Sequence, residues 1–311
     1  MSLRLSLAAL SLLLAAPLRA QDAAPAAKPA LYDEAADGRA QIDAALARAG
    51  KENRRVLIQW GANWCGWCIR LHELCFMDKA LAHELKYEYD VVHVDIGRWN
   101  KHMELAASYG ADLKGGVPFL TVLAADGSVL ANQETGSLEA PGDVAGHDPA
   151  KVLAFLEQHQ APYRKAADLR AEALAAAARD GRQVLLHFGA PWCGWCHKLE
   201  AWMELPSVAP LLARQFVDCK IDVDRTQGGQ ELLAELSAGK SGGIPWFAFL
   251  DAEGRVLATS TGPEGNTGFP AAPAEIAHFR GMLEQAAPRL QPQDVETLVR
   301  SLQPPEKPAG G

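Results

Sequence analysis

Basic residues are comparatively scarce in this sequence, and no lysine- or arginine-rich run concentrates them. The chain has 30 lysine and arginine residues against 38 acidic ones, which gives a formal net charge of −8 at pH 7. Because binding to nucleic acid or to an anionic membrane surface depends on clustered positive charge, neither is expected as a partner. Long apolar runs are also missing after residue 20, so no membrane span is expected in the rest of the chain.

The first 20 residues have the pattern of an export signal rather than of part of a fold. Arg4 supplies a positive charge, residues 5–14 form a short apolar stretch, and a polar break runs from Pro17 to Ala20. A membrane span needs about 20 apolar residues, so a secretory signal peptide cleaved after Ala20 is favoured over an uncleaved anchor. We therefore expect a secreted or periplasmic protein, in an oxidising compartment where cysteines can pair.

Cysteine is scarce too, with six residues, and four of them belong to two copies of one motif. The sequence Trp-Cys-Gly-Trp-Cys occurs at residues 64–68 and again at residues 192–196. The other two, Cys75 and Cys219, have no counterpart in the opposite copy and have apolar neighbours, so they are expected to be buried free thiols. A bridge between them would have to span two domains and is not expected.

The repeat divides the chain into two units of ordinary domain size. Both units follow one order: helix, strand, motif at the start of a helix, strand, helix, Gly-Gly-Val-Pro or Gly-Gly-Ile-Pro step, hairpin and closing helix. Apolar strands between helices predict parallel pairing, so each unit is expected to be an α/β domain with a mixed sheet flanked by helices. The expected segments are a signal peptide over 1–20, a flexible leader over 21–32, a first domain over 33–160, a second domain over 161–290, and a Pro-rich tail over 291–311 that is disordered at its end.

The two cysteines of each motif are placed for reversible oxidation rather than for scaffolding. The first, Cys65 or Cys193, stands at the expected start of a helix, where free N–H groups and the helix dipole stabilise a thiolate. The second, Cys68 or Cys196, follows nearly one helical turn later, within reach of the first sulfur. The first is therefore expected to attack a partner's disulfide, and the second to resolve the mixed disulfide.

The residues around these cysteines are candidate substrate-binding groups. The glycine between the cysteines would keep the turn open, and the preceding tryptophan can shield one side of the sulfur from water. The Gly-Gly-β-branched-Pro steps follow the two motifs at nearly the same interval. That recurrence favours a cis X–Pro bond, which would expose backbone beside the sulfurs for pairing with an extended substrate. The full set is Trp64, Gly66, Trp67, Val117 and Pro118 in the first unit, and Trp192, Gly194, Trp195, Ile244 and Pro245 in the second.

Two other uses of a Cys-x-x-Cys pair fit the pattern less well. A structural zinc site usually has its pairs about 15–20 residues apart, whereas here each pair lies in its own unit. Permanent structural disulfides rarely occupy helix starts beside tryptophan. Redox activity is therefore favoured, and no metal and no cofactor are expected.

The Trp-Cys-x-x-Cys motif, the β-branched-Pro step and the order of elements together resemble the thioredoxin fold in both halves, from about Asp33 to Ala287. The resemblance implies thiol–disulfide exchange, with the two Cys-x-x-Cys pairs as redox pairs and Pro118 and Pro245 as cis prolines. Two such domains in an exported protein are similar in outline to protein disulfide isomerase and to bacterial disulfide-handling proteins. The partners implied are exported proteins with disulfides and a thiol electron donor or acceptor that the sequence does not identify.

The sequence departs from the thioredoxin pattern around both motifs. Thioredoxin has a buried Asp six residues before the first cysteine, whereas this chain has Gln59 and His187. Gln59 cannot titrate, and His187 is either a proton relay or a hydrogen-bonded core residue. His197 follows Cys196, where it either stabilises a nearby thiolate as a cation or points into solvent. The Gly-Trp dipeptide between the cysteines means that a reduction potential cannot be carried over from the family.

The leading functional hypothesis is a disulfide oxidoreductase that works in the reductase or isomerase direction. This direction rests on the tandem arrangement and on a motif without the histidine that favours oxidising behaviour in related proteins. The alternative is a tandem module that holds clients or copper, with redox activity secondary. Because His187 and His197 have no counterparts in the first unit, the second unit is expected to be the more reactive at neutral pH.

Overall fold

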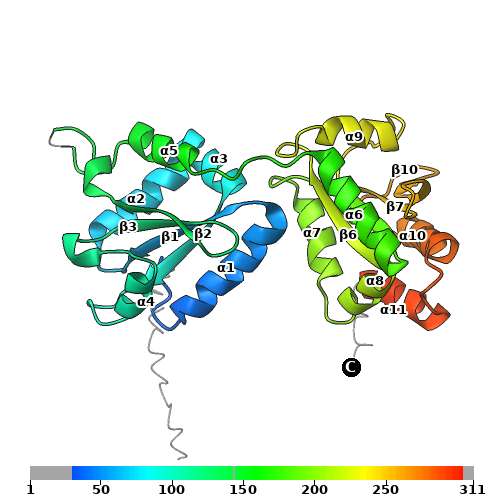
Figure 1. Cartoon of the computed structure of the whole chain (residues 1–311), viewed down its shortest axis with the longest axis horizontal. Coiled ribbons are helices and arrows are strands. Elements are labelled where there is room, and N and C mark those ends of the chain that lie inside the picture. Colours follow the sequence, from blue (N-terminus) through cyan, green and yellow to red (C-terminus); the bar gives the residue numbers. More distant parts are fainter. Residues whose placement is uncertain (1–29, 143, 304–311) are drawn as a thin grey trace, which may run out of the picture.

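A computed structural model describes residues 30–142 and 144–303, and the expected signal peptide lies outside them. The chain forms two units, each built on a four-stranded sheet with helices on both faces (Figure 1). This confirms the predicted fold class, two consecutive α/β domains with mixed sheets. No helix within the described ranges combines the length and the apolar character needed to cross a membrane.

The first unit has the strand order β2-β1-β3-β4. β1 and β2 are parallel, while β3 pairs antiparallel with both β1 and β4. Its elements are α1 (Gly38–Glu52), β1 (Arg55–Gly61), α2 (Gly66–Met77), α3 (Lys79–Glu88), β2 (Tyr89–Asp95), α4 (Met103–Ser108), η1 (Leu113–Gly115), β3 (Phe119–Leu123), β4 (Val129–Glu134), η2 (Gly136–Leu138) and α5 (Pro149–Gln158).

The second unit repeats this order as β6-β5-β7-β8, with β5 and β6 parallel. A separate two-stranded ribbon, β10-β9, follows β8. Its elements are α6 (Ala166–Asp180), β5 (Gln183–Gly189), α7 (Gly194–Met203), α8 (Ala209–Gln215), β6 (Phe216–Asp222), α9 (Gly229–Leu236), β7 (Trp246–Leu250), β8 (Val256–Thr259), β9 (Thr261–Gly262), β10 (Gly265–Asn266), α10 (Pro273–Ala286) and α11 (Pro292–Leu302).

The central strand of each sheet is buried on both faces, which is why its sequence is a continuous apolar run. In the first unit, Val56 and Ile58 of β1 pack with Ile42 on the α1 side of the sheet. Leu57 packs with Leu71 on the opposite side, where α2, α3 and α5 lie. Burying each such side chain stabilises the fold by roughly 1.5–3 kcal/mol. The two layers of helices hold the carboxyl end of β1, and with it the cysteine motif, in a fixed place.

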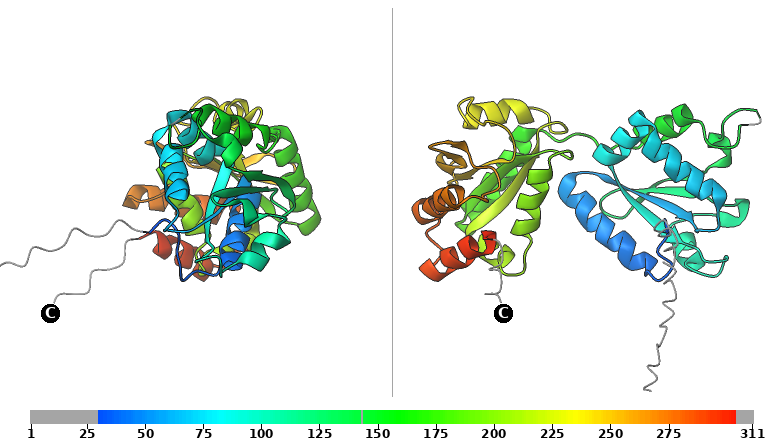
Figure 2. Two further views of the ribbon diagram at one scale, coloured as in Figure 1. Left: turned by 90° about the vertical axis from the view of Figure 1, so that its left-hand side faces the viewer. Right: turned by 180° about the vertical axis from the view of Figure 1, so that it is seen from behind.

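The end of the chain corrects the expectation of a tail from residue 291. Residues 292–302 form α11, which lies against the second unit (Figure 2). Val295, Leu298, Val299 and Leu302 recur at helical spacing and join its main core. The prolines suggested a tail, but one of them stands at the first position of this helix, where a missing N–H costs little. Residues 304–311 lie outside the described residues.

Direct contacts hold the two units against each other. The Arg225 side chain lies in the second unit and donates to Glu88 of the first, and both side chains are only 3% exposed. It also donates to the backbone carbonyls of Glu52 and Asn53 at the end of α1, at 2.9 Å each. The segment between α5 and α6 also takes part in this contact, since its Tyr163 hydroxyl donates to Glu88 at 2.8 Å.

Candidate functional site

Each cysteine pair lies at the junction between a central strand, β1 or β5, and the helix that follows it, α2 or α7. Cys65 is the N-cap of α2 and Cys193 the N-cap of α7, and both pairs are closed as disulfides. The backbone N–H of Cys68 donates to the Cys65 sulfur at 3.1 Å, and Cys196 N–H donates to Cys193 in the same way. A helix N-terminus with an N–H aimed at the sulfur stabilises a thiolate there. This arrangement supports thiol–disulfide redox chemistry at both sites.

All four motif cysteines are buried when the disulfides are closed. Cys65 is 4% exposed and Cys68 not at all, while Cys193 is 4% exposed and Cys196 only 2%. The first cysteine of each pair is thus only slightly more exposed than the second in the closed disulfides.

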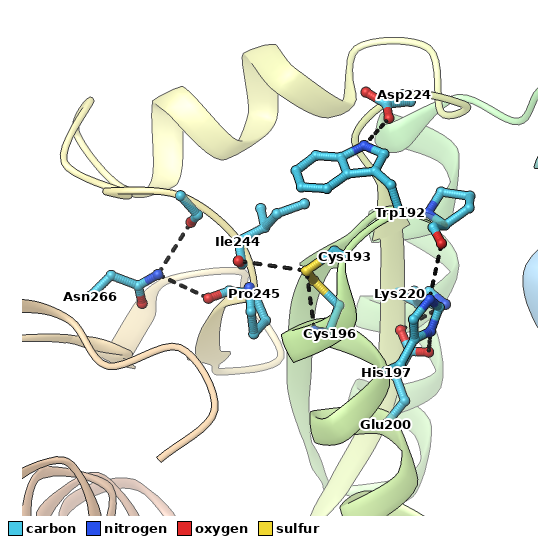
Figure 3. The surroundings of a disulfide bond; sticks show 12 residues. Trp192, Cys193, Cys196, His197, Glu200, Lys220, Asp224, Ile244, Pro245 and Asn266 are labelled. Atoms are coloured by element: carbon cyan, nitrogen blue, oxygen red, sulfur yellow. Dashed lines mark hydrogen bonds and ion pairs between the residues drawn. A yellow bond between two sulfur atoms is a disulfide. The ribbon is translucent and has the colours of Figure 1, made fainter. Parts of the chain in front are cut away.

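The proline steps lie directly beside the first sulfurs. The Val117–Pro118 and Ile244–Pro245 peptide bonds are both cis. The Val117 carbonyl oxygen is 3.5 Å from the Cys65 sulfur, and the Ile244 carbonyl oxygen is 3.6 Å from the Cys193 sulfur (Figure 3). Backbone of the chain thus stands next to the reactive atom in each unit.

Tryptophans form the exposed rim of the second site. Trp192 and Trp195 are 53% and 52% exposed. The Trp192 indole N–H donates to Asp224, which fixes the ring beside the motif (Figure 3). Trp195 stacks on Phe269 with ring centroids 6.3 Å apart, and the Lys198 ammonium lies 4.0 Å from the Trp195 centroid.

The corresponding tryptophans of the first site have different neighbours. Trp64 is 43% exposed and donates to the Gly97 carbonyl. Trp67 packs edge-on against His147. Gly66, like its counterpart Gly194, has open space where a side chain would stand. The Gly-Trp dipeptides between the cysteines are therefore identical in sequence, but their tryptophans pack against different residues in the two units.

The two candidate histidines lie against carboxylates of their own unit. His197 is half exposed, and its Nε2 is 3.0 Å from the Pro191 carbonyl oxygen while its Nδ1 is 3.8 Å from Glu200 (Figure 3). His187 is buried in β5, with Nε2 3.1 Å from an Asp218 oxygen on β6. In the part of the chain described, neither ring is hydrogen-bonded to a motif sulfur.

Sequence reasoning missed a charged pair beneath Cys196. A Cβ built on Gly189 would lie 3.6 Å from the Cys196 sulfur and 3.6 Å from a Glu200 carboxylate oxygen. The Lys220 ammonium is 2.7 Å from the same oxygen, and both side chains are about one-fifth exposed (Figure 3). Glu200 stands four residues after Cys196, so helical spacing alone could have indicated that both share one face of α7.

At the positions that correspond to Glu200 and Lys220, the first unit has His72 and His93, whose ring centroids lie 5.2 Å apart. Gln59 stands at the position of His187. The Gln59 side-chain amide donates to the Cys68 carbonyl at 3.0 Å and to the Tyr32 hydroxyl oxygen at 2.8 Å. Tyr32 is fully buried and clusters with Cys65 and Cys68. No spacing rule connects Tyr32 with the motif, because it comes from the segment before α1.

The remaining cysteines, Cys75 and Cys219, form no disulfide. Cys219 is buried and Cys75 is partly buried. Burial raises the pKa of each thiol to about 12, and nearby carboxylates, Asp78 and Asp218 respectively, add to the rise. Both thiols are therefore protonated and weakly nucleophilic at neutral pH.

One protein-family model matches both units of the chain. It is described as thioredoxin-like and matches residues 37–125 and again residues 167–252. No curated protein matches the chain. A solved disulphide isomerase from Xylella fastidiosa Temecula1 is 26% identical, with a TM-score of 0.38, over 42% of this chain and 98% of its own.

Two further solved structures match shorter parts. A DsbH oxidoreductase is 23% identical, with a TM-score of 0.28, over 39% of this chain and 83% of its own. A thioredoxin from Thermus thermophilus is 30% identical, with a TM-score of 0.25, over 31% of this chain and 72% of its own. Because the family model matches both units, each with its own Cys-x-x-Cys pair at a helix start, the chain belongs to the thioredoxin-like family.

Proposed function

We propose that the protein is an exported thiol–disulfide oxidoreductase that reduces or rearranges disulfides in other exported proteins. The observation that carries the proposal is the setting of the first sulfur in each unit. It receives a backbone N–H at 3.1 Å and lies next to the carbonyl of a cis peptide. The N–H favours the thiolate, and the exposed backbone offers a place for an extended client.

The chemistry is a two-step exchange. The Cys65 thiolate attacks one sulfur of a client disulfide, so that a mixed disulfide forms and the other client sulfur leaves as a thiolate. Cys68, as its thiolate, then attacks the Cys65 sulfur and releases the second client sulfur. The client gains two electrons and the Cys65–Cys68 pair loses two, which an external thiol donor must restore. Cys193 and Cys196 carry out the same sequence in the second unit.

Client binding is supported by the surface around each sulfur. The Val117 and Ile244 backbone can pair with an extended segment on one side, as in strand addition. On the other side, exposed tryptophans such as Trp64 and Trp192 provide apolar contact area at low entropic cost.

Resolution in the second unit requires a proton to leave Cys196. Glu200 and that sulfur flank the same point above Gly189, and we propose that the carboxylate accepts the proton through a bridging water. The Lys220 ammonium lies 2.7 Å from the same carboxylate and holds it on this side of Gly189.

The reductase or isomerase direction and the export remain parts of the proposal that rest on sequence. The dipeptide between the cysteines contains no histidine, and the first 20 residues have the pattern of a secretory signal. The matching compartment is the periplasm or the extracellular space, where client proteins carry disulfides.

Activity assays with purified protein test the proposal. Wild-type protein should reduce insulin with dithiothreitol as donor and should reactivate scrambled ribonuclease. The double variant Cys65→Ser/Cys193→Ser should lose both activities, while the matched control Cys75→Ser/Cys219→Ser should retain them. Equal activity of wild type and the first variant would refute the proposal.

The exposed tryptophans also favour a second candidate, a client-holding module in which redox activity is secondary. Suppression of aggregation by a variant that lacks all four motif cysteines would support it. Copper binding through the thiolates, the other form of this candidate, is checked by the metal content of protein purified without oxygen.

A further inference from the structure

The segment before α1 reaches the resolving sulfur of the first unit. A Cβ built on Gly61 would lie 2.3 Å from the Tyr32 hydroxyl oxygen and 2.7 Å from the Cys68 sulfur. Tyr32 is 0% exposed and packs in one cluster with both motif cysteines. The Tyr32 hydroxyl and the Cys68 sulfur therefore face one another across the small space above Gly61.

The backbone of Tyr32 is held in place by the motif itself. Tyr32 N–H donates to the Asn63 side-chain oxygen at 3.0 Å, and the Asn63 amide donates back to the Tyr32 carbonyl at 2.9 Å. Asn63 stands two residues before Cys65. The hydroxyl is thus fixed relative to the sulfurs by a two-point clamp rather than by contact with a mobile surface.

The hydrogen bond from Gln59 to Tyr32 leaves the O–H proton of Tyr32 available for a second bond. Gln59 donates to the Tyr32 oxygen, so Tyr32 is the acceptor in that bond. A phenol carries a single O–H donor, and the sulfur across the space is an acceptor. Burial raises the pKa of Tyr32, Gln59 opposes that shift, and Asp95 adds to it, so the hydroxyl stays neutral and keeps its proton.

Among the described residues of the second unit, no tyrosine belongs to the hydrophobic cluster around its sulfurs. Pro191 stands in the place of Asn63 and has no side-chain amide to clamp a preceding segment. The segment before α6 turns to the first unit instead, where Gln160 donates to Glu84 and Tyr163 to Glu88. The apolar residues that cluster with Cys193 and Cys196 are Ala190, Val223 and Ile244.

We propose that Tyr32 is a positioning residue of the first site, whose hydroxyl donates a hydrogen bond to the Cys68 sulfur once the Cys65–Cys68 disulfide is reduced. A bond made only to the reduced sulfur stabilises the dithiol form and makes the pair easier to reduce. Reduction takes up two electrons and two protons from an external dithiol, which becomes a disulfide. The inference rests on the proposed function, since it concerns the same exchange reaction.

The equilibrium of the first pair with dithiothreitol tests this role. It is measured in a Cys193→Ser/Cys196→Ser background, with and without Tyr32→Phe. The Phe variant should shift the equilibrium constant toward the disulfide about tenfold, which lowers the reduction potential by about 30 mV. Tyr163→Phe, which also removes a tyrosine hydroxyl, should leave the potential unchanged. A shift below about threefold in Tyr32→Phe would overturn the proposal.

The second pair provides an internal control. Measured in a Cys65→Ser/Cys68→Ser background, its potential should not respond to Tyr32→Phe. An equal shift in both pairs would show a general effect on the protein and would also overturn the role of Tyr32.

A spectroscopic readout serves even if Tyr32→Phe fails to fold. In wild-type protein with ¹³C-labelled tyrosine, the Cζ resonance of Tyr32 should move when the first pair is reduced. It should not move when only the second pair is reduced, and a resonance unaffected by either would contradict the proposal. If neither pair exchanges with dithiothreitol at all, the proposed function fails; if both exchange normally and Tyr32 has no effect, only this inference fails.

Discussion

Arg225 and Glu88 form a buried ion pair across the boundary between the two units. Arg225 Nε lies 3.0 Å from one Glu88 oxygen and Nη2 lies 2.7 Å from the other, so the contact is bidentate. Burial alone would lower the pKa of Arg225, but Glu88, with smaller contributions from Asp222 and Tyr163, outweighs it and the pKa is raised. Arg225 also donates to the first unit's backbone, and Glu88 also accepts from Tyr163. The buried pair therefore fixes one unit against the other.

Removing Glu88 should therefore weaken the protein strongly. Glu88→Ala leaves a guanidinium buried without its carboxylate, and breaking a buried pair in this way costs about 3–5 kcal/mol. Urea unfolding at pH 7 measures the loss. As a matched control, Arg255→Ala removes a largely exposed arginine from its pair with Asp251 and should change the midpoint little. Equal midpoints for Glu88→Ala and wild type would show that the units do not depend on this contact.

The free thiols should resist alkylation in the native protein. Burial raises the pKa of Cys75 and Cys219 to about 12, so very little thiolate is present at pH 8. Iodoacetamide added to reduced native protein should label Cys65 and Cys193, as mass spectrometry of peptides would show. Cys75 and Cys219 should react only after denaturant is added. Labelling of Cys75 as fast as Cys65 would contradict the burial seen here.

Acid should destabilise the first unit through His93. Burial lowers the pKa of His93 to about 4, with His72 adding to the effect, against an ordinary value of 6.5. The unfolded chain then binds more protons than the folded one between these values, so stability is full above about pH 6.5 and falls as the pH drops toward 4. The loss from this group is up to roughly 3 kcal/mol.

His93→Phe removes that proton-binding site at similar volume. Its stability, from urea unfolding at pH 7 and at pH 4.5, should fall less over this interval than that of wild type. An identical fall in both proteins would assign the acid sensitivity to other groups.

Resolution at the second site should slow when its carboxylate is neutralised. Glu200→Gln keeps the shape of the side chain but cannot accept a proton from Cys196, and we expect resolution to slow roughly tenfold, below the usual range for a general base because water also reaches this partly exposed site. The rate is followed in a Cys65→Ser/Cys68→Ser background by stopped-flow release of a chromogenic thiol. Glu204→Gln, an exposed neighbour paired with Lys51, should be unchanged. A similar slowing in both variants would remove Glu200 from the mechanism.

The fold could be predicted from sequence because its signals are local. Strands such as β1 and β5 are short apolar runs, and each motif stands between a strand and a helix. The repeated order of these elements therefore predicts the fold of both units. The prolines after residue 290 led to the wrong prediction of a tail, because proline is common both in tails and at the first position of a helix. Only burial of the apolar face of α11 distinguishes the two.

The surroundings of the sulfurs could be predicted only in part. The motif itself predicts the cysteines and the tryptophans beside them. Tyr32, however, comes from a segment far from Cys68 in sequence, and Lys220 comes from the neighbouring strand β6. Contacts of this kind depend on packing rather than on spacing. The greater reactivity expected for the second unit stays a prediction, and its physical basis now lies in Glu200 rather than in His197, which is turned toward Pro191.

The central claim, that each unit exchanges disulfides through its first cysteine, is tested most directly by trapping. Cys68→Ser/Cys196→Ser should accumulate mixed disulfides with a client such as partly oxidised ribonuclease. The adducts should be visible on non-reducing gels and should disappear when dithiothreitol is added. Adding Cys65→Ser should remove the adducts of the first unit, and adding Cys193→Ser those of the second. No adduct in the trapping variant, or adducts that persist when both first cysteines are serine, would contradict the claim.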